Sequence, residues 1–303
     1  MIGALELGLI YALMALGVYL TFRILDFPDL TVDGSFTTGG GTAAMLILGG
    51  TSPWVATLAG ACAGLVAGTI TGLLHTKGRI NPLLAGILTQ IGLYSINLRI
   101  MGAPNLPLLR EDTLITPLRE AGLLGGMVAV AIFAAIALVV KFGLDWFLHT
   151  DQGLALQATG DNERMIRSFG VNTDRTKIIG LALSNGLVGL CGALVAQYQG
   201  FADISMGIGL IIAGLASVIV GQALIPSRLV FWATAAVVVG SVLYRVAIQA
   251  ALELGLDPND MKLISALLVI IALLLPRWSP LRRIPTLRSL ARSAAVEPGG
   301  GGR

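Results

Sequence analysis

Long apolar segments alternate with short polar breaks along most of the chain. At about 1.5 Å per residue, Leu5–Phe22 would form a helix of about 27 Å, close to the thickness of the hydrocarbon core of a membrane. Similar segments follow at Trp54–Leu74, Pro82–Met101, Gly122–Val140, Ile178–Gln197, Leu229–Ala250 and Leu263–Leu275. Two more, Phe36–Leu48 and Ile208–Val220, are too short to cross comfortably and favour half-helices or re-entrant segments. The pattern predicts an all-α, polytopic transmembrane protein with about 8–10 membrane segments, some of them short and broken.

The composition agrees with a membrane location for most of the chain. Charged residues make up 12% of the 303 residues and hydrophobic residues 55%, and the mean hydropathy is +0.84. A soluble domain carries about 25% charged residues to cover its surface, so a soluble enzyme is excluded. The 39 glycines are typical of membrane helices that pack closely.

Lysine and arginine positions predict which side of the membrane each loop faces, because cytoplasmic loops are enriched in both. Basic residues gather in the turn after Leu74, in the stretch 149–177 and in the tail 277–303, and an alternating path places all three on one side. We expect that side to be cytoplasmic and residues 103–121 to face outside, with the N-terminus outside if all nine segments cross. The net charge of +3 arises in these loops and does not indicate a nucleic-acid partner.

A shift of 174 residues aligns the two halves of the chain, since it places Phe27–Thr31 on Phe201–Ser205 and Trp54–Leu74 on Arg228–Ile248. One unpaired span lies between the copies and would invert the second relative to the first. Inverted repeats with matched broken helices are typical of transporters. The resulting transmembrane domain, 1–276, comprises repeat 1 at about 3–102, a linking span at 122–148, a loop at 149–177 and repeat 2 at about 178–276, followed by a basic, partly disordered tail at 277–303.

Motifs of catalysis are missing from the sequence. The nearest approach to a P-loop, residues 72–77, lacks the second glycine, so we expect no ATP site in this chain. His75 and His149 are the only histidines and lie in separate loops, which makes a histidine-based metal site unexpected. We therefore expect no catalytic activity and no metal or cofactor in the chain itself.

The polar stretch after His149 contains the pattern of a short amphipathic helix. Asp161 or Asn162 can cap its start, and Gly170 can end it. Glu163 in the first turn and Arg167 in the last turn both suit the helix dipole.

Three apolar residues of this helix, Met165, Ile166 and Phe169, form a stripe at positions i, i+1 and i+4. On the cytoplasmic side that stripe has no lipid to face, so we expect it to dock into a groove of another protein. The alternative is an ordinary interfacial helix between two spans.

Several stretches together carry a family resemblance: Gly153, Ala158 and Gly170–Arg175, then Gly186–Ala193 and Gly214–Gly221. In these the chain resembles the membrane subunits of ABC importers, in the branched-chain amino acid and ribose permease superfamily, over about residues 3–276. A narrower branch, the single-permease systems labelled as tryptophan or tyrosine importers, is similar in Asp29–Phe36, Ile80–Thr89 and Leu93–Gly102.

The resemblance implies an assembly in the bacterial plasma (inner) membrane. Two copies of the chain would form the pathway in the lipid, two ATPase subunits would bind ATP and Mg²⁺ below it, and an extracytoplasmic solute-binding protein would dock above. Residues 160–170 would be the coupling helix, through which ATPase closure changes the side to which the pathway opens. The coupling residues expected there are Asp161, Asn162, Glu163, Arg164, Met165, Ile166, Arg167, Phe169 and Gly170.

Polar residues inside the spans and at the breaks are candidates for the pathway, because polar groups within a membrane are costly. The candidates are Asp29, Thr31, Asp33, Ser35, Gln90, Tyr94, Asn97, Asp203 and Ser205. Gln90, Tyr94 and Asn97 fall on one helical face, at i, i+4 and i+7, and are expected to face the same space. The alternative interpretations are helix-to-helix hydrogen bonds for residues in the spans and helix capping for the aspartates.

The function expected from these features is that of an importer permease for a small solute, with an amino acid as the expected cargo and an aromatic one as a candidate. An ion-coupled secondary transporter remains the alternative, with Asp29 and Asp203 as its candidate coupling carboxylates. That alternative leaves the helix at 160–170 without a role.

Overall fold

The computed structural model describes residues 1–227, 229–254, 263, 266, 267 and 270. Six helical segments are long and apolar enough to cross a membrane. They are α1 (Ile2–Tyr19) with its π-helical continuation η1 (Leu20–Ile24), α3 (Pro53–Thr76), α4 (Pro82–Met101), α6 (Met127–Leu148), α8 (Thr173–Gln199) and α10 (Val230–Glu253). The remaining elements are α2 (Thr31–Leu48), β1 (Asn105–Pro107), α5 (Thr116–Glu120), α7 (Asp151–Ser168), β2 (Phe201–Asp203) and α9 (Leu210–Leu224).

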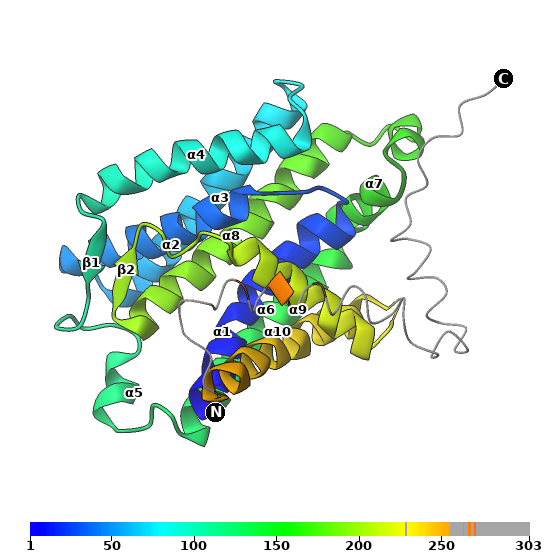
Figure 1. The fold of residues 1–303 in the computed structure, drawn as a ribbon. Coiled ribbons are helices and arrows are strands. Elements are labelled where there is room, and N and C mark those ends of the chain that lie inside the picture. Colours follow the sequence, from blue (N-terminus) through cyan, green and yellow to red (C-terminus); the bar gives the residue numbers. More distant parts are fainter. Residues whose placement is uncertain (228, 255–262, 264–265, 268–269, 271–303) are drawn as a thin grey trace.

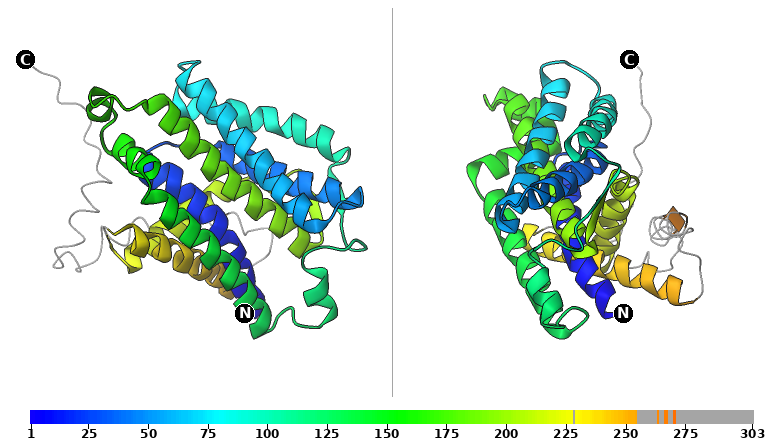
Figure 2. Two further views of the ribbon diagram at one scale, coloured as in Figure 1. Left: turned by 180° about the vertical axis from the view of Figure 1, so that it is seen from behind. Right: turned by 90° about the vertical axis from the view of Figure 1, so that its left-hand side faces the viewer.

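The helices are arranged around α1 and α8, which lie side by side at the centre of the bundle (Figure 1). On one side α2 and α3 pack against α8, and α4 forms an outer layer over α2 and α3. On the other side α9, α10 and α6 pack against α1. Helix α7 lies at one end of the bundle, and β1, β2 and α5 lie at the other (Figures 1 and 2).

The helices of each half of the chain pack on the central helix of the other half. Helices α2 and α3 pack on α8, while α9 and α10 pack on α1. The two central helices run antiparallel: Ser184 Oγ donates to the Gly17 carbonyl (2.7 Å), and Cys191 Sγ donates to the Ile10 carbonyl (3.2 Å). This packing is compatible with the predicted inverted repeat, which stays a prediction. The predicted last span, Leu263–Leu275, and the tail lie outside the described residues, apart from Leu263, Ala266, Leu267 and Ile270.

The polar break after the first span is shorter than predicted. The sequence pattern favours a polar, irregular stretch over Arg23–Ser35 and a short helix over Phe36–Leu48, but η1 continues to Ile24 and α2 begins at Thr31. Asp33 and Ser35 are therefore helical, and both are buried. Hydropathy does not reveal this, because their polar side chains are satisfied inside the protein rather than exposed to lipid. The second short helix, α9, has 15 residues.

Two short strands depart from the all-α prediction. β1 and β2 pair antiparallel, with Leu106 opposite Ala202. The pairing is extended by Leu108 N–H, which donates to the Gly200 carbonyl (2.7 Å), and by Ile204 N–H, which donates to the Pro104 carbonyl (2.8 Å). Three-residue strands are too short to give a pattern of alternation, so the sequence does not reveal them.

Glycines at every fourth position of α3 let this helix approach α8 at backbone distance. Gly60, Gly64, Gly68 and Gly72 face α8, and a Cβ on Gly68 would collide with the Leu181 carbonyl and lie 2.8 Å from the Asn185 Cβ. Membrane helices lack a hydrophobic driving force for association, so such close packing is a main source of their cohesion.

We predict that Gly68→Ala lowers the free energy of unfolding by about 1–3 kcal/mol, because the added methyl group overpacks the contact between α3 and α8. Thermal unfolding of the detergent-solubilised chain measures the loss. Gly92→Ala in α4 is the matched control, since a Cβ there meets no atom within 4 Å. Equal melting temperatures for the two variants would contradict the proposed role of this helix contact.

Labelling of single cysteines tests the orientation of the bundle. In a background without Cys62 and Cys191, an impermeant thiol reagent should label Asp112→Cys on intact cells and should reach Asp151→Cys after permeabilisation. The two positions lie on opposite sides of the membrane in the orientation that the basic loops predict. Labelling of Asp151→Cys on intact cells with protection of Asp112→Cys would invert the orientation.

Candidate functional site

The two helix breaks meet inside the bundle, where the carboxylate of Asp33 caps α9. Asp33 lies in the first turn of α2, and its Oδ2 and Oδ1 accept hydrogen bonds from Gly209 N–H (2.8 Å) and Ile211 N–H (2.9 Å). Gly207 packs directly on the carbonyl group of Asp33. The first N–H groups of a helix have no partner within the helix and carry a partial positive charge, which a carboxylate neutralises. The start of α9 is thus fixed to the start of α2.

Each break contains the same local turn, built on an aspartate. Asp29 Oδ1 accepts from Thr31 N–H (2.9 Å), and Asp203 Oδ1 accepts from Ser205 N–H (2.8 Å). The two pairs are related by the 174-residue shift, from Asp29 to Asp203 and from Thr31 to Ser205. Their surroundings differ, because Asp29 is buried while Asp203 is partly exposed and accepts from Asn105 Nδ2 (3.3 Å).

Asn185 of α8 connects the first break to two neighbouring elements. Its Nδ2 donates to Asp29 Oδ2 (2.6 Å), and its Oδ1 accepts from Ser35 Oγ (2.7 Å). Beside it, the hydroxyls of Thr31 and Thr71 lie 2.8 Å apart. All five side chains are buried. This polar junction joins α2, α3 and α8.

The predicted pathway residues of the first break therefore come together, but in the interior of one chain. Asp29, Thr31, Asp33 and Ser35 are buried and hydrogen-bonded to protein groups. Capping and helix-to-helix bonding, the alternative interpretations, describe their observed contacts. Ser205 lies exposed at the other end of the second break.

The three polar residues of α4 do not share one environment. Asn97 is buried and its Nδ2 donates to the Gly34 carbonyl (3.4 Å), whereas Tyr94 is 50% exposed and Gln90 is half-buried. Asn97 lies on the inner side of α4, because this helix packs on α2 along the strip that contains the residue. That all three residues face one pathway stays a prediction. Tyr94 remains on the outward face.

Helix α7 contains a sharp break at Asn162, with φ −158° and ψ 89°. The Asn162 side chain caps the next helical turn, since its Oδ1 accepts from Met165 N–H (3.0 Å). The chain then forms a short helix at residues 163–168 and turns at Gly170, whose φ of +86° favours glycine. We call residues 163–168 the docking helix. The preceding part of α7, which the sequence does not predict, packs against η1 where Gly160 meets the Ile24 carbonyl.

Glu163 fixes the docking helix to the start of α8. It accepts hydrogen bonds from Lys177 Nζ (2.8 Å), Arg167 Nη2 (3.1 Å) and Thr173 Oγ1 (3.2 Å). Burial by itself would raise the pKa of Glu163, but these donors lower it below its ordinary value. Glu163 is therefore ionised near neutral pH. Arg167 also pairs with Asp174 (3.1 Å).

The docking helix and the turn after it present apolar side chains to the outside. Phe169 is 75% exposed and Met165 is 47% exposed, while Ile166 is half-buried. The charged residues Asp161 and Arg164 are exposed beside them. Large apolar side chains held outward by a fixed polar network are typical of a protein interaction surface.

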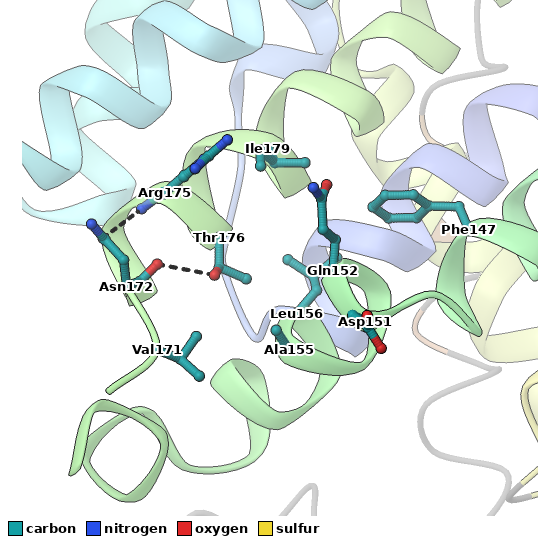
Figure 3. A pocket seen from close by; sticks show the side chains of 10 residues that line it. All are labelled: Phe147, Asp151, Gln152, Ala155, Leu156, Val171, Asn172, Arg175, Thr176 and Ile179. Atoms are coloured by element: carbon teal, nitrogen blue, oxygen red, sulfur yellow. Dashed lines mark hydrogen bonds between the residues drawn. The ribbon is translucent and has the colours of Figure 1, made fainter. Parts of the chain in front are cut away.

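A cleft of about 260 Å³ lies next to the docking helix (Figure 3). It is lined by Phe147, Asp151, Gln152, Ala155, Leu156, Val171, Asn172, Arg175, Thr176 and Ile179. On one of its sides Asn172 caps α8, accepting from Arg175 N–H (3.1 Å), and its carbonyl accepts from Thr176 Oγ1 (3.0 Å). These bonds fix the connection between the docking helix and α8.

A buried ion pair in α6 joins this helix to α10. Lys141 Nζ lies 2.6 Å from Asp145 Oδ2 and 3.2 Å from the centre of the Phe231 ring, and Asp145 Oδ1 accepts from Thr234 Oγ1 (2.6 Å). The sequence prediction does not include this pair. The signal available in the sequence was a lysine and an aspartate four residues apart within an apolar span, a spacing that allows an ion pair on one helical face.

These features together define a class, a multi-pass membrane transport protein with broken helices in its interior and a short helix with exposed apolar side chains at one end. Residues 1–274 match the family described as "Branched-chain amino acid transport system / permease component", and the chain belongs to that family. Its members are transporters rather than enzymes, and the chain is a multi-pass protein of the inner membrane. The resemblance to ABC importer permeases is confirmed.

Two individual relatives and one solved structure are similar to the chain. The chain is 44% identical to the tyrosine transport system permease protein of Clostridioides difficile, over 89% of this chain and 88% of the relative. It is 33% identical to an uncharacterized protein of Rickettsia prowazekii, over 90% and 96% of the two chains. A solved structure described as an inward-facing conformation of a metal-chelate type ABC transporter aligns with 18% identity and a TM-score of 0.49, over 90% of this chain and 83% of its own.

We predict that Asn185→Ala destabilises the bundle by about 1–3 kcal/mol, because Asp29 Oδ2 and the Ser35 hydroxyl both lose a partner in a buried site. The melting temperature in detergent reports the change. Ser217→Ala is the matched control, a buried polar residue whose hydroxyl bonds within its own helix to the Ala213 carbonyl (2.8 Å). A loss no larger than that of the control would contradict the importance of the polar junction.

Proposed function

We propose that this chain is the membrane-spanning subunit of an ABC importer and that two copies form the translocation pathway. Two ATPase subunits supply the energy, with ATP and Mg²⁺ bound in those subunits. An extracytoplasmic solute-binding protein delivers the solute. The observation that carries the proposal is the docking helix with the turn after it. Met165 and Phe169 are exposed there, while Glu163 fixes the base of the helix to α8.

The fixed base matters because a coupling element must transmit displacement. Closure of the ATPases would push on Met165 and Phe169, and the bonds of Glu163 to Lys177 and Thr173 would pass that displacement to α8. Helix α8 contacts α1, α2 and α3, so its movement would reach both halves of the bundle. The energy enters as contacts that differ between two states.

The second copy is expected to cover the outer face of α4. Leu84, Leu88, Ile91 and Tyr94 are exposed along this helix, and Tyr94 places a hydroxyl among apolar side chains. A weakly polar surface of this kind suits a pathway between two copies, because tight binding inside the permease would slow release. Membrane lipid would cover the remaining apolar surface.

The proposed solute is an amino acid with an aromatic side chain, with tyrosine as the first candidate. The support is the 44% identity to a protein described as a tyrosine transport system permease. The exposed ring of Tyr94 agrees with an aromatic or amphipathic solute, since aromatic rings pair favourably. Affinity and selectivity would lie mainly in the binding protein.

We predict that Phe169→Asp lowers the amount of ATPase that co-purifies with the permease by about tenfold or more, because the variant places a carboxylate in the centre of an apolar contact. ATP-dependent uptake of labelled tyrosine into vesicles that hold the complex and its binding protein should fall in parallel. Membrane insertion should be unchanged, because Phe169 is exposed in the single chain.

Leu109→Asp is the matched control, since Leu109 is about as exposed as Phe169 but lies in the external loop. It should leave the amount of co-purified ATPase unchanged. Wild-type ATPase recovery and uptake in Phe169→Asp would contradict the coupling role. Uptake that follows an imposed ion gradient without any ATPase would instead support a secondary transporter.

A further inference from the structure

His75 lies at the cytoplasmic end of α3 and contacts three separate parts of the chain. Its Nδ1 is 2.9 Å from the carbonyl oxygen of Ile80, in the turn that leads to α4. Its Nε2 is 3.4 Å from Lys177 Nζ, in the first turns of α8. The rings of His75 and Phe27 pack edge to face, with their centres 5.2 Å apart. Phe27 leads directly into the first helix break.

The partners of His75 determine its tautomer. A carbonyl oxygen can only accept, so Nδ1 must carry the hydrogen that faces Ile80. Nε2 then holds a lone pair, which accepts from the ammonium group of Lys177. In this arrangement the ring donates through Nδ1 to the turn and accepts through Nε2 from α8.

Lys177 connects this imidazole to the docking helix, because its Nζ also donates to Glu163 Oε2 (2.8 Å). A continuous path of polar contacts thus runs from Glu163 through Lys177 and His75 to the Ile80 carbonyl. It crosses from α7 to α8, then to α3 and the start of α4. The path therefore connects the docking helix to α4, although, among the residues that the structure describes, the docking helix makes no direct hydrogen bond to α4.

Space for movement exists around this path. A cleft of about 540 Å³ separates the turn at residues 77–81 from the docking helix. The charged residues that face it are Lys77 and Arg79 from the turn, Glu163 and Arg167 from α7, and Asp174 and Lys177 from α8. Solvent fills a cleft of this size. The contact between Lys177 and His75 therefore borders solvent and is not part of a packed core.

We infer that His75 is a positioning residue that transmits the position of the docking helix to the turn between α3 and α4. The inference rests on the proposed function, in which ATPase movement enters through the docking helix. Through Ile80 the movement would reach the first turn of α4, whose outer face carries Tyr94. Through Phe27 it would also reach the break that contains Asp29.

Two substitutions separate this role from a structural one. His75→Phe keeps a ring against Phe27 but loses both polar contacts, whereas His75→Gln keeps an acceptor for Lys177. The readout is ATP hydrolysis by the permease–ATPase complex in lipid nanodiscs, expressed as the stimulation produced by its binding protein loaded with tyrosine. We expect His75→Phe to lower the stimulation about threefold to tenfold and His75→Gln to retain most of it.

His149→Phe is the matched control, because His149 bonds to the Asp145 carbonyl (2.6 Å) and does not touch the path. This control should retain the wild-type stimulation.

Normal stimulation in His75→Phe would overturn the role of His75. A loss in His75→Gln as large as that in His75→Phe would also overturn it, because glutamine keeps the acceptor for Lys177. If His75→Phe fails to assemble, His75→Gln decides the question, since the role requires it to retain most of the stimulation. A wild-type complex that does not form or shows no stimulation would instead count against the proposed function, so the two failures are distinguishable.

Discussion

The capping of α9 by Asp33 is the contact on which the arrangement of the bundle depends. A helix that begins inside a membrane leaves N–H groups without partners, and neither lipid nor water is there to satisfy them. Asp33 supplies two of the missing acceptors from the first turn of α2. The two halves of the chain are joined at the point where each is interrupted. Short helices can end in the interior only because such a partner is present.

Two polar networks with different physical properties result from this arrangement. The polar junction around Asn185 is buried, so its hydrogen bonds are strong and their loss is costly. The network around Glu163 is partly exposed, so its ion pairs are screened and individually weak. The buried network keeps α2, α3 and α8 together as a unit. The exposed network holds the docking helix against the start of α8 through several weak contacts at once, all of which meet at Glu163.

The two breaks illustrate how one local motif can serve two purposes. Asp29 and Asp203 form the same turn, yet Asp29 is part of the buried junction while Asp203 bonds across β1 and β2 to Asn105. Partial burial by itself would raise the pKa of Asp203, but hydrogen bonds from Ser205 hold it below its ordinary value. Asp203 is therefore ionised at neutral pH.

The sequence by itself determined the class of fold and most of the spans that the structure describes, because these depend on local hydropathy and glycine positions. It further indicated the short helix that ends before Gly170, because its capping residues are local. It also located both breaks, since the aspartate turns are local. The tertiary structure decided what those breaks do: the start of α2 at Thr31, the capping of α9 by Asp33 and the burial of Asn97 all depend on partners far away in the chain. The relation between His75 and Lys177 was likewise invisible, because 102 residues separate them and neither belongs to a motif. A polar residue in an apolar span has the same local pattern whether it lines a pathway or bonds to a neighbouring helix, and only the position of that neighbour distinguishes the two.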